Sequence, residues 1–264
     1  MCDICNNSGY IYENLPDGSR GIRLCDCVLS NCKCNKEYPY LYLDGDKLKK
    51  CYCAPFRLKF EKVKYAFSNS GLPKKFYLKF LDDFSTKTES GNEDTELNKL
   101  RGIAATYIEK YNKNNPRGML FYGNSGNGKT LLAAIILNEL IFQKAINGKF
   151  VSISFSFFNK LRETYNSLSE DYGQAMTILD DLIKTDLLIL DDFGIQRNTP
   201  WELEMLYNLI DRRYEEEAPI IITTNNKPED FKGIYYNRIY SRILEMCRMI
   251  EFNVPDYRER YAIK

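Results

Sequence analysis

Histidine is missing from this chain of 264 residues, and its absence removes two kinds of site. Without an imidazole, the protein cannot use histidine as a general acid or base, nor as a ligand for a metal ion. Excess charge of one sign is also missing, because the formal net charge is only +1. No overall field draws the chain onto nucleic acid, so any such contact has to come from a local patch.

Long apolar runs and a secretion signal are absent as well. A bilayer span needs roughly 20 apolar residues, and only the segment behind residue 129 approaches that length. That segment carries Asn138, Glu139, Gln143 and Lys144, so we interpret it as a helix buried against a sheet. The N-terminus lacks a basic region followed by an apolar one. We expect a cytoplasmic protein that does not contact a membrane.

Cysteine, by contrast, is plentiful and unevenly placed, with eight of the nine in the first 53 residues. They form four close pairs, and a pair two or three residues apart can direct two thiolates at one cation. Two such pairs complete a tetrahedral shell. The ninth, Cys247, lies in a segment expected to be an apolar helix and is predicted to be an ordinary buried thiol. The eight are Cys2, Cys5, Cys25, Cys27, Cys32, Cys34, Cys51 and Cys53.

The eight cysteines frame two segments of similar sequence. Tyr10-Ile11-Tyr12 follows one cysteine pair and Tyr40-Leu41-Tyr42 follows another, and each leads to Asp-Gly and then to a second pair. This order predicts a duplicated β-hairpin. The simplest assignment is two zinc ions per chain, although sequence alone leaves interleaved ligation open. One ion would take Cys2, Cys5, Cys25 and Cys27, and the other Cys32, Cys34, Cys51 and Cys53.

Disulfides and an iron–sulfur cluster are the alternatives to zinc. Disulfides suit small secreted domains, whereas this chain is expected in a compartment that keeps thiols reduced. Four pairs of the CxC and CxxC kind suit zinc ribbons better than iron–sulfur clusters. Both zinc shells would be closed and structural, because roughly 50 residues bury too little apolar surface to fold alone. We expect residues 1–54 to form a rigid docking module.

A glycine-rich segment in the middle of the chain fits the phosphate-binding pattern G-x-x-x-x-G-K-[ST] at every fixed position. Met119–Tyr122 before it predicts a strand, and Lys129–Asn147 behind it predicts a helix closed by Gly148. The expected nucleotide is ATP or ADP. In that context Lys129 can reach the β- and γ-phosphates of ATP, and Thr130 can hold Mg²⁺. The predicted nucleotide-contacting residues are Gly123, Asn124, Ser125, Gly126, Asn127, Gly128, Lys129, Thr130 and Leu131.

Two further apolar runs end in polar residues and predict buried parallel strands. The run from Asp186 ends in Asp191 and Asp192, of which the first can hold Mg²⁺ and the second can orient or deprotonate the attacking water. The run from Pro219 ends at Asn225, which can position that water, although a turn asparagine is the simpler explanation on its own. Between them, Thr199 and Pro200 predict the start of a helix.

Arg238 and Arg242 lie four apart in a helix predicted from about Tyr236 to Met249, so they share one face. One interpretation is a pair of surface arginines, with Arg242 reaching Glu245. The other is an arginine finger that contacts the γ-phosphate of a neighbouring subunit, which requires an oligomer.

From about Gly71 onward the chain resembles the AAA+ helicase loaders of the DnaC/DnaI type. The segments that carry the resemblance are Gly71–Lys75 with Phe80 and Phe84, the phosphate loop, Leu187–Gly194, Trp201–Asp211 with Arg213-Tyr214, Ile222–Asn225, Arg238–Arg242 with Glu245–Cys247, and Asp256–Arg258.

The resemblance implies an α/β fold, with a central parallel sheet flanked by helices and a small N-terminal zinc-binding hairpin module. It implies an ATPase in which Asn225 is sensor 1, Arg242 the finger acting in trans, Arg238 its companion and Arg258 a sensor-2-like residue. Residues 71–264 would form the AAA+ domain and residues 55–70 a basic linker or helix. Two departures stand out: typical relatives carry one four-cysteine set, and many AAA+ proteins have Glu at the position of Asp192.

The implied partners are a replicative hexameric helicase, further copies of this chain, and single-stranded DNA. For DNA the basic residues Lys160 and Arg162 lie beside Phe157 and Phe158, a combination suited to phosphate contact and base stacking. A helix start with its aromatics in the core is the alternative. The sequence ends soon after Arg258 without a helix-turn-helix, which argues against an initiator that reads duplex DNA.

The cysteine module also resembles the zinc-binding, helicase-docking domain of the DnaI-like members. Together these features predict an ATP-dependent loader that binds the helicase through its N-terminal zinc module and single-stranded DNA through an AAA+ oligomer. An IstB-like regulatory ATPase of transposition and an adaptor that uses nucleotide only as a switch are the alternatives.

Overall fold

Five short parallel strands form the central sheet in the computed structural model, which describes residues 2–87, 91–112, 117–153, 157–164, 173, 175–194, 199–231 and 234–256. The sheet order is β6-β7-β8-β5-β9. Strands β7 and β8 are buried along their whole length, as expected for a parallel sheet covered on both faces. The strands are β5 (Gly118–Tyr122), β6 (Gly148–Ser152), β7 (Leu187–Asp191), β8 (Ile220–Thr224) and β9 (Cys247–Glu251).

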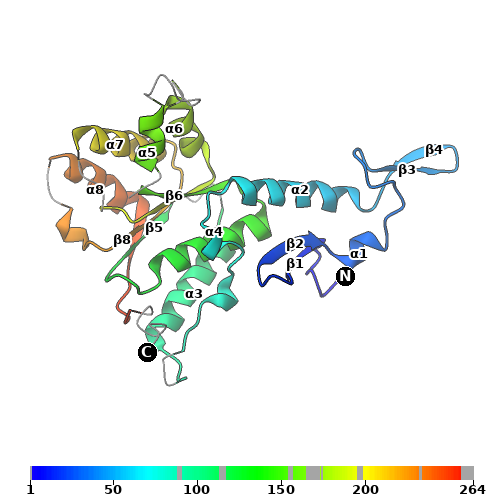
Figure 1. The fold of residues 1–264 in the computed structure, drawn as a ribbon, viewed down its shortest axis with the longest axis horizontal. Helices are drawn as coiled ribbons and strands as arrows, with labels where there is room; N and C mark the ends of the chain where they lie inside the picture. The colour runs from blue at the N-terminus through cyan, green and yellow to red at the C-terminus, as the bar shows by residue number, and fades with distance from the viewer. Residues whose placement is uncertain are drawn as a thin grey trace.

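Helices cover both faces of this sheet (Figure 1). Successive residues of a strand point to opposite faces, so Met119 and Phe121 join one core while Leu120 joins the other. The first core is built with α2 (Ala54–Asn69), α3 (Thr95–Lys110) and α4 (Lys129–Lys144). The second is built with α5 (Phe158–Glu163), α6 (Ala175–Lys184), α7 (Pro200–Glu215) and α8 (Ile234–Met246).

Short 3-10 turns complete the described elements: η1 (Lys74–Phe76), η2 (Leu81–Asp83) and η4 (Pro228–Asp230). Within the described ranges, none of the helices has the length and apolar character needed to cross a bilayer.

The α/β architecture is confirmed, but two predicted element ends are wrong. Helix α4 ends at Lys144 with Ala145 in the left-handed conformation, and Gly148 begins β6. Glycine is needed there for space, because a Cβ would lie 2.3 Å from a methyl carbon of Leu137. Cys247 is buried as predicted, yet it begins strand β9 rather than lying in a helix. A short apolar run after a helix fits either element, and pairing with β5 decides for a strand.

The N-terminal cysteine region contains two antiparallel hairpins, as predicted. The first hairpin is β1 (Tyr10–Asn14) with β2 (Arg20–Leu24), followed by α1 (Asp26–Leu29), and the second is β3 (Leu41–Asp44) with β4 (Lys47–Lys50), followed by α2. Residues 54–69 are helix, and Phe60, Val63 and Phe67 belong to the first core. The first hairpin lies beside α4, whereas the second projects from the far end of α2 (Figure 1).

The repeat is offset by one residue from its appearance in sequence. Tyr10 pairs with Leu24, directly before Cys25, whereas Leu41 pairs with Lys50, directly before Cys51. Leu41 therefore occupies the place of Tyr10, and Leu43 that of Tyr12. Because side chains alternate along a strand, this offset moves the tyrosine of the second hairpin, Tyr42, to the opposite face.

Candidate nucleotide site and cysteine sites

The phosphate loop joins β5 to α4, as the motif predicts. Gly126 and Gly128 have φ of +77° and +92°, a region that suits glycine because it has no Cβ. No side chain caps the start of α4, so the first turn of the helix faces the loop without a capping group. Open N–H groups and the positive end of a helix dipole make a binding site for anions. The loop is therefore shaped to hold phosphates.

Lys129 is folded into this loop and is almost completely buried. Its ammonium group donates to the carbonyl oxygens of Gly123 at 2.8 Å and Asn124 at 2.6 Å, and to Oδ1 of Asn127 at 3.0 Å. The cation is thus positioned above the loop that phosphates would enter.

Asp191 ends β7 beside the first turn of α4. Its Oδ1 accepts hydrogen bonds from the hydroxyls of Thr130 at 2.7 Å and Thr223 at 2.6 Å. Burial raises the pKa of Asp191, and the two hydroxyls work against that rise. A carboxylate and a hydroxyl that share one hydrogen bond are the oxygen ligands that Mg²⁺ prefers.

Strand order explains why Asp192 and Asn225 come together. Strand β8 lies between β5 and β7, so its carboxyl end emerges between the phosphate loop and the two aspartates. A cavity of about 220 Å³ is lined there by Lys75, Phe76, residues 125–131, Asp192 and Asn225. The sequence prediction placed these groups at one sheet edge, and the structure brings them together. A larger cavity of about 510 Å³ beside Gly118, at the start of β5, contains no loop residue.

The segment after β9 also contacts the loop, which sequence reasoning did not anticipate. Asn127 donates its amide N–H to the carbonyl oxygen of Phe252 at 2.8 Å. A Cβ added to Gly126 would lie 1.7 Å from the carboxylate of Asp256, so glycine is required for this approach. Arg258, the sensor-2-like residue of the prediction, lies outside the described residues.

Arg242 lies away from this cavity, on the surface between α7 and α8. It pairs with Asp211, donates to the hydroxyl of Tyr207 at 3.2 Å, and lies 5.1 Å from the centre of that ring. Its partner is not Glu245, which accepts a hydrogen bond from Tyr214 instead. The companion Arg238 is exposed on the same helix. Neither arginine lines the nucleotide cavity of its own chain.

The DNA-contacting prediction is wrong for two of its four residues. Phe157 and Phe158 are only 4% exposed each and pack in the second core, so they cannot stack on bases in this structure. Arg162 pairs with the buried Glu202 and lies over the ring of Trp201 at 5.6 Å. The side chain of Lys160 is outside the described part. The alternative, core aromatics at a helix start, describes the phenylalanines.

The eight N-terminal cysteines form two clusters, with the pairing that the simplest assignment predicts. In each cluster the four sulfur atoms lie within 4.8 Å of one another. Sulfurs bound to one zinc ion at about 2.3 Å in a tetrahedron lie about 3.8 Å apart. The measured separations fit, at 3.8 Å for Cys2–Cys25, 3.6 Å for Cys5–Cys27 and 3.5 Å for Cys34–Cys53. Both clusters could hold zinc, and interleaved ligation is not what the structure forms.

The first hairpin is tied to the first core of the sheet. Tyr10 is completely buried, donates its hydroxyl to the carbonyl oxygen of Phe142 at 2.5 Å, and meets that ring edge-on at 5.1 Å. Tyr12 stacks on Phe80 at 4.7 Å. Ile22 and Leu24 pack against the same core. We call this contact region on α4 and residues 76–83 the hairpin seat.

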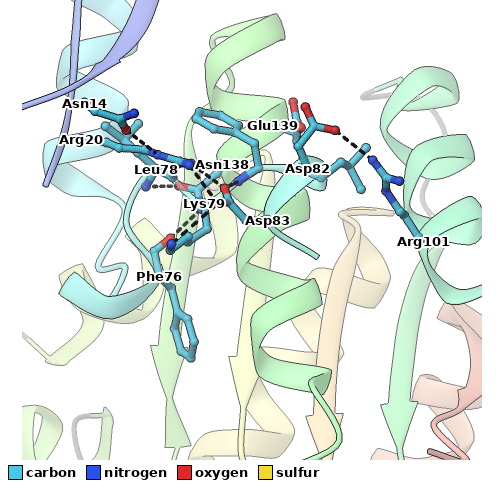
Figure 2. A network of polar contacts seen from close by, with 12 residues as sticks. Asn14, Arg20, Phe76, Leu78, Lys79, Asp82, Asp83, Arg101, Asn138 and Glu139 are labelled. Atoms are coloured by element: carbon cyan, nitrogen blue, oxygen red, sulfur yellow. Dashed lines mark hydrogen bonds and ion pairs between the residues drawn. The ribbon is translucent and has the colours of Figure 1, made fainter. Parts of the chain in front are cut away.

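Figure 2 shows the polar half of the hairpin seat. Arg20 makes a two-pronged ion pair with Asp83, at 2.5 and 2.9 Å, and also donates to the carbonyl oxygen of Leu78. From α4, Asn138 binds both Phe76 and Leu78, and Glu139 accepts from the N–H of Leu81. These two buried polar residues of α4 therefore hold residues 76–83, on which the first hairpin rests.

A five-stranded parallel sheet with a phosphate loop and paired acids at its carboxyl edge is the AAA+ P-loop fold. Residues 61–264 match the family model described as IstB-like ATP binding protein. The chain belongs to this family.

The chain is also similar to helicase loaders. The chain is 29% identical over 164 residues to the replicative helicase loader DnaC of Escherichia coli strain K12, which covers 61% of this chain and 64% of that protein. The crystal structure of the DnaC helicase loader superimposes with a TM-score of 0.59 and 24% identity, over 69% of this chain and 100% of that one. The crystal structure of DnaI superimposes with a TM-score of 0.57 and 22% identity, over 72% of this chain and 98% of that one. The predicted DnaC/DnaI-type resemblance is confirmed.

Proposed function

We propose that this protein is an ATP-dependent loader that places a replicative hexameric helicase on single-stranded DNA. The observation that carries the proposal is the assembled sheet edge, where the phosphate loop, Asp191, Asp192 and Asn225 meet. The sequence similarity to DnaC supports the loader role over an IstB-like role in transposition. The two cysteine clusters support it too, because zinc bound there would give the N-terminal region a rigid surface on which a helicase could dock.

The proposed roles follow from position. Lys129 would contact the β- and γ-phosphates, and Thr130 with Asp191 would hold Mg²⁺ after the hydroxyl turns from the carboxylate to the ion. Asp192 would orient or deprotonate the attacking water, since it faces the same cavity as Asn225. Bound Mg²⁺ would neutralise phosphate charge, and zinc in the cysteine clusters would be structural.

Arg242 would act in trans, because it is remote from its own cavity and lies on an accessible surface. Arg238 would accompany it at the interface between subunits. The pairing with Asp211 and Tyr207 would hold the guanidinium in place until a neighbouring phosphate replaces the carboxylate. ATP binding would thereby favour the oligomer.

Two substitutions test the role of ATP. We expect Lys129→Ala to abolish nucleotide binding, and Asp192→Asn to retain binding while hydrolysis falls at least 100-fold. Both should lose helicase loading on single-stranded circular DNA, measured by unwinding of an annealed strand. Lys184→Ala, at an exposed lysine of α6, is the matched control and should load normally. Undiminished loading by both variants would refute the ATP-dependent mechanism, and stimulation of a transposase instead would favour the IstB-like role.

A mixing experiment tests the trans finger. Lys129→Ala subunits lack a working loop and Arg242→Ala subunits lack the finger, so each alone should be inactive. Mixed oligomers contain junctions at which an intact loop faces an intact Arg242, and their ATPase rate should exceed the sum of the two parents. A rate equal to that sum would exclude the shared site.

A further inference from the structure

The two hairpins are copies of one unit. What covers one face of the first hairpin therefore indicates what the equivalent face of the second hairpin is built to contact. Strand pairing sets the correspondence: the pairs Tyr10–Leu24 and Tyr12–Ile22 match Leu41–Lys50 and Leu43–Leu48. In the first hairpin this face lies on the hairpin seat, with Tyr10 completely buried. The face is thus the one through which the unit docks within its own chain.

In the second hairpin the same face carries three leucines and Lys50, and two of the leucines are uncovered. Leu43 is 71% exposed and Leu48 is 63% exposed, and the two are directly opposite one another across the strands. A single apolar residue on a surface needs no explanation, whereas neighbouring exposed apolar residues mark interaction sites. The paired leucines of the projecting hairpin are of the second kind. We call Leu41, Leu43, Leu48 and Lys50 the tip face.

The other face of the second hairpin already has its contacts. Tyr42 packs with the second cysteine cluster, and the ammonium of Lys33 lies 5.5 Å from the centre of its ring. Lys49 forms an ion pair with Asp44 at 2.5 Å. These contacts fix the orientation of the second hairpin. The tip face is therefore exposed because it lies on the opposite side of the hairpin from these contacts.

We propose that the tip face docks on the end of an α-helix in a different protein, as the first hairpin docks on the end of α4. The template for the occupant is the seat itself: an aromatic ring near a helix C-terminus, with a main-chain carbonyl within reach. Lys50 replaces Leu24 of the first hairpin, so the occupant should present free carbonyls or a carboxylate, which a helix C-terminus supplies.

A second copy of this chain does not fit this description. In every copy the end of α4 is covered by that copy's own first hairpin, through Tyr10 and Tyr12. The equivalent seat is therefore occupied before another molecule arrives. A partner with a free helix end is required, and under the proposed function, on which this inference rests, that partner is the helicase.

The test uses the full chain and the purified replicative hexameric helicase of the source organism, with affinity measured by calorimetry or surface plasmon resonance. Leu43→Ser with Leu48→Ser should weaken binding at least about 30-fold, since two leucines that bury on docking act as its anchors. The matched control, Asp44→Ala with Lys47→Ala, changes the opposite face of the same two strands and should stay within about threefold of the original chain. Melting temperature, zinc content and intrinsic ATPase rate should be unchanged in both.

Each other outcome is decisive. If both variants bind like the original chain, the tip face is not the docking surface, while the loader function stands. If the leucine variant alters self-association in sedimentation while helicase binding is unchanged, the occupant is a second copy and the inference is wrong. If the original chain itself does not bind the helicase, both the loader function and this inference fail.

Discussion

The two hairpins of this protein share one scaffold and differ in what covers the corresponding face. In the first, Tyr10 of that face lies in the first core, and in the second, Leu43 and Leu48 of that face lie in solvent. A four-cysteine metal site can supply folding free energy that a small unit cannot obtain from its own core. The face of the hairpin is then free to serve contacts elsewhere, within the chain in one copy and outside it in the other.

Loss of a metal site should separate the two hairpins most strongly. We expect Cys5→Ser to lower the free energy of unfolding of the ATPase domain by about 4 kcal/mol or more, because the first hairpin would leave its seat. Cys34→Ser should change that transition by less than about 1 kcal/mol, although each variant should lose about one of two zinc ions per chain. Denaturant unfolding and metal analysis measure both. Equal destabilisation by Cys5→Ser and Cys34→Ser would show that the two hairpins contribute alike to the stability of the rest of the chain.

The next largest effect should come from the buried ring at the seat. Tyr10→Ala leaves a cavity and an unpaired carbonyl at Phe142, which should cost about 3–5 kcal/mol. Tyr10→Phe retains the ring and should cost only about 1 kcal/mol. Unfolding in urea measures the free energy of unfolding of both variants. Similar losses for the two would show that the hydrogen bond, rather than packing of the ring, holds the hairpin.

The ion pair at the seat should contribute less and should depend on pH. Burial would raise the pKa of Asp83, but Arg20, the N–H of Phe80 and Lys79 outweigh it and hold the pKa below its ordinary value. Its contribution is therefore present above the unfolded pKa of about 4 and is lost as the pH falls through the folded pKa. Asp83→Asn should cost about 1–3 kcal/mol at pH 7. The free energy of unfolding of the Asp83→Asn variant should fall less than that of the original chain as the solution is acidified below pH about 4. If the two chains lose stability in parallel with falling pH, Asp83 does not contribute in this way.

The smallest effect on stability should come from the tip face. Leu48→Ala should change the free energy of unfolding by less than about 0.5 kcal/mol, because the side chain touches little in the free protein. Ile22→Ala, at the corresponding place in the first hairpin, should cost about 2 kcal/mol or more. The pair of measurements compares one structural position in two environments. A loss at Leu48 as large as that at Ile22 would mean that the tip face is covered within its own chain.

The sheet edge was predictable because each part has a local signal. A glycine-rich loop, two aspartates after an apolar run, and an asparagine after another each stand out in sequence, and a parallel sheet brings strand ends together. Contacts between distant segments have no such signal. Nothing in sequence indicated that Asp256 approaches Gly126, or that Arg213, which burial leaves with a pKa of about 10, donates to the carbonyls of Leu182 and Pro219.

The hairpin repeat was predictable in kind but not in register. The matching tyrosines suggested an alignment that strand pairing corrects by one residue. The loops differ in length, with residues 15–19 between β1 and β2 but only residues 45–46 between β3 and β4. Loop length sets the register of a hairpin, so sequence similarity between the strands could not reveal which faces correspond.

Helix α4 begins at Lys129 in the phosphate loop and ends at the seat of the first hairpin, so one rod of 16 residues serves both sites. A shortened chain that starts at residue 61, where the family match begins, would expose Phe142 and Phe80 to solvent and invite aggregation. Residues 30–53, by contrast, carry the second hairpin and its four cysteines and contribute nothing to the first two cores. If the tip face docks as proposed, grafting that short segment alone should transfer partner choice and leave the nucleotide site intact.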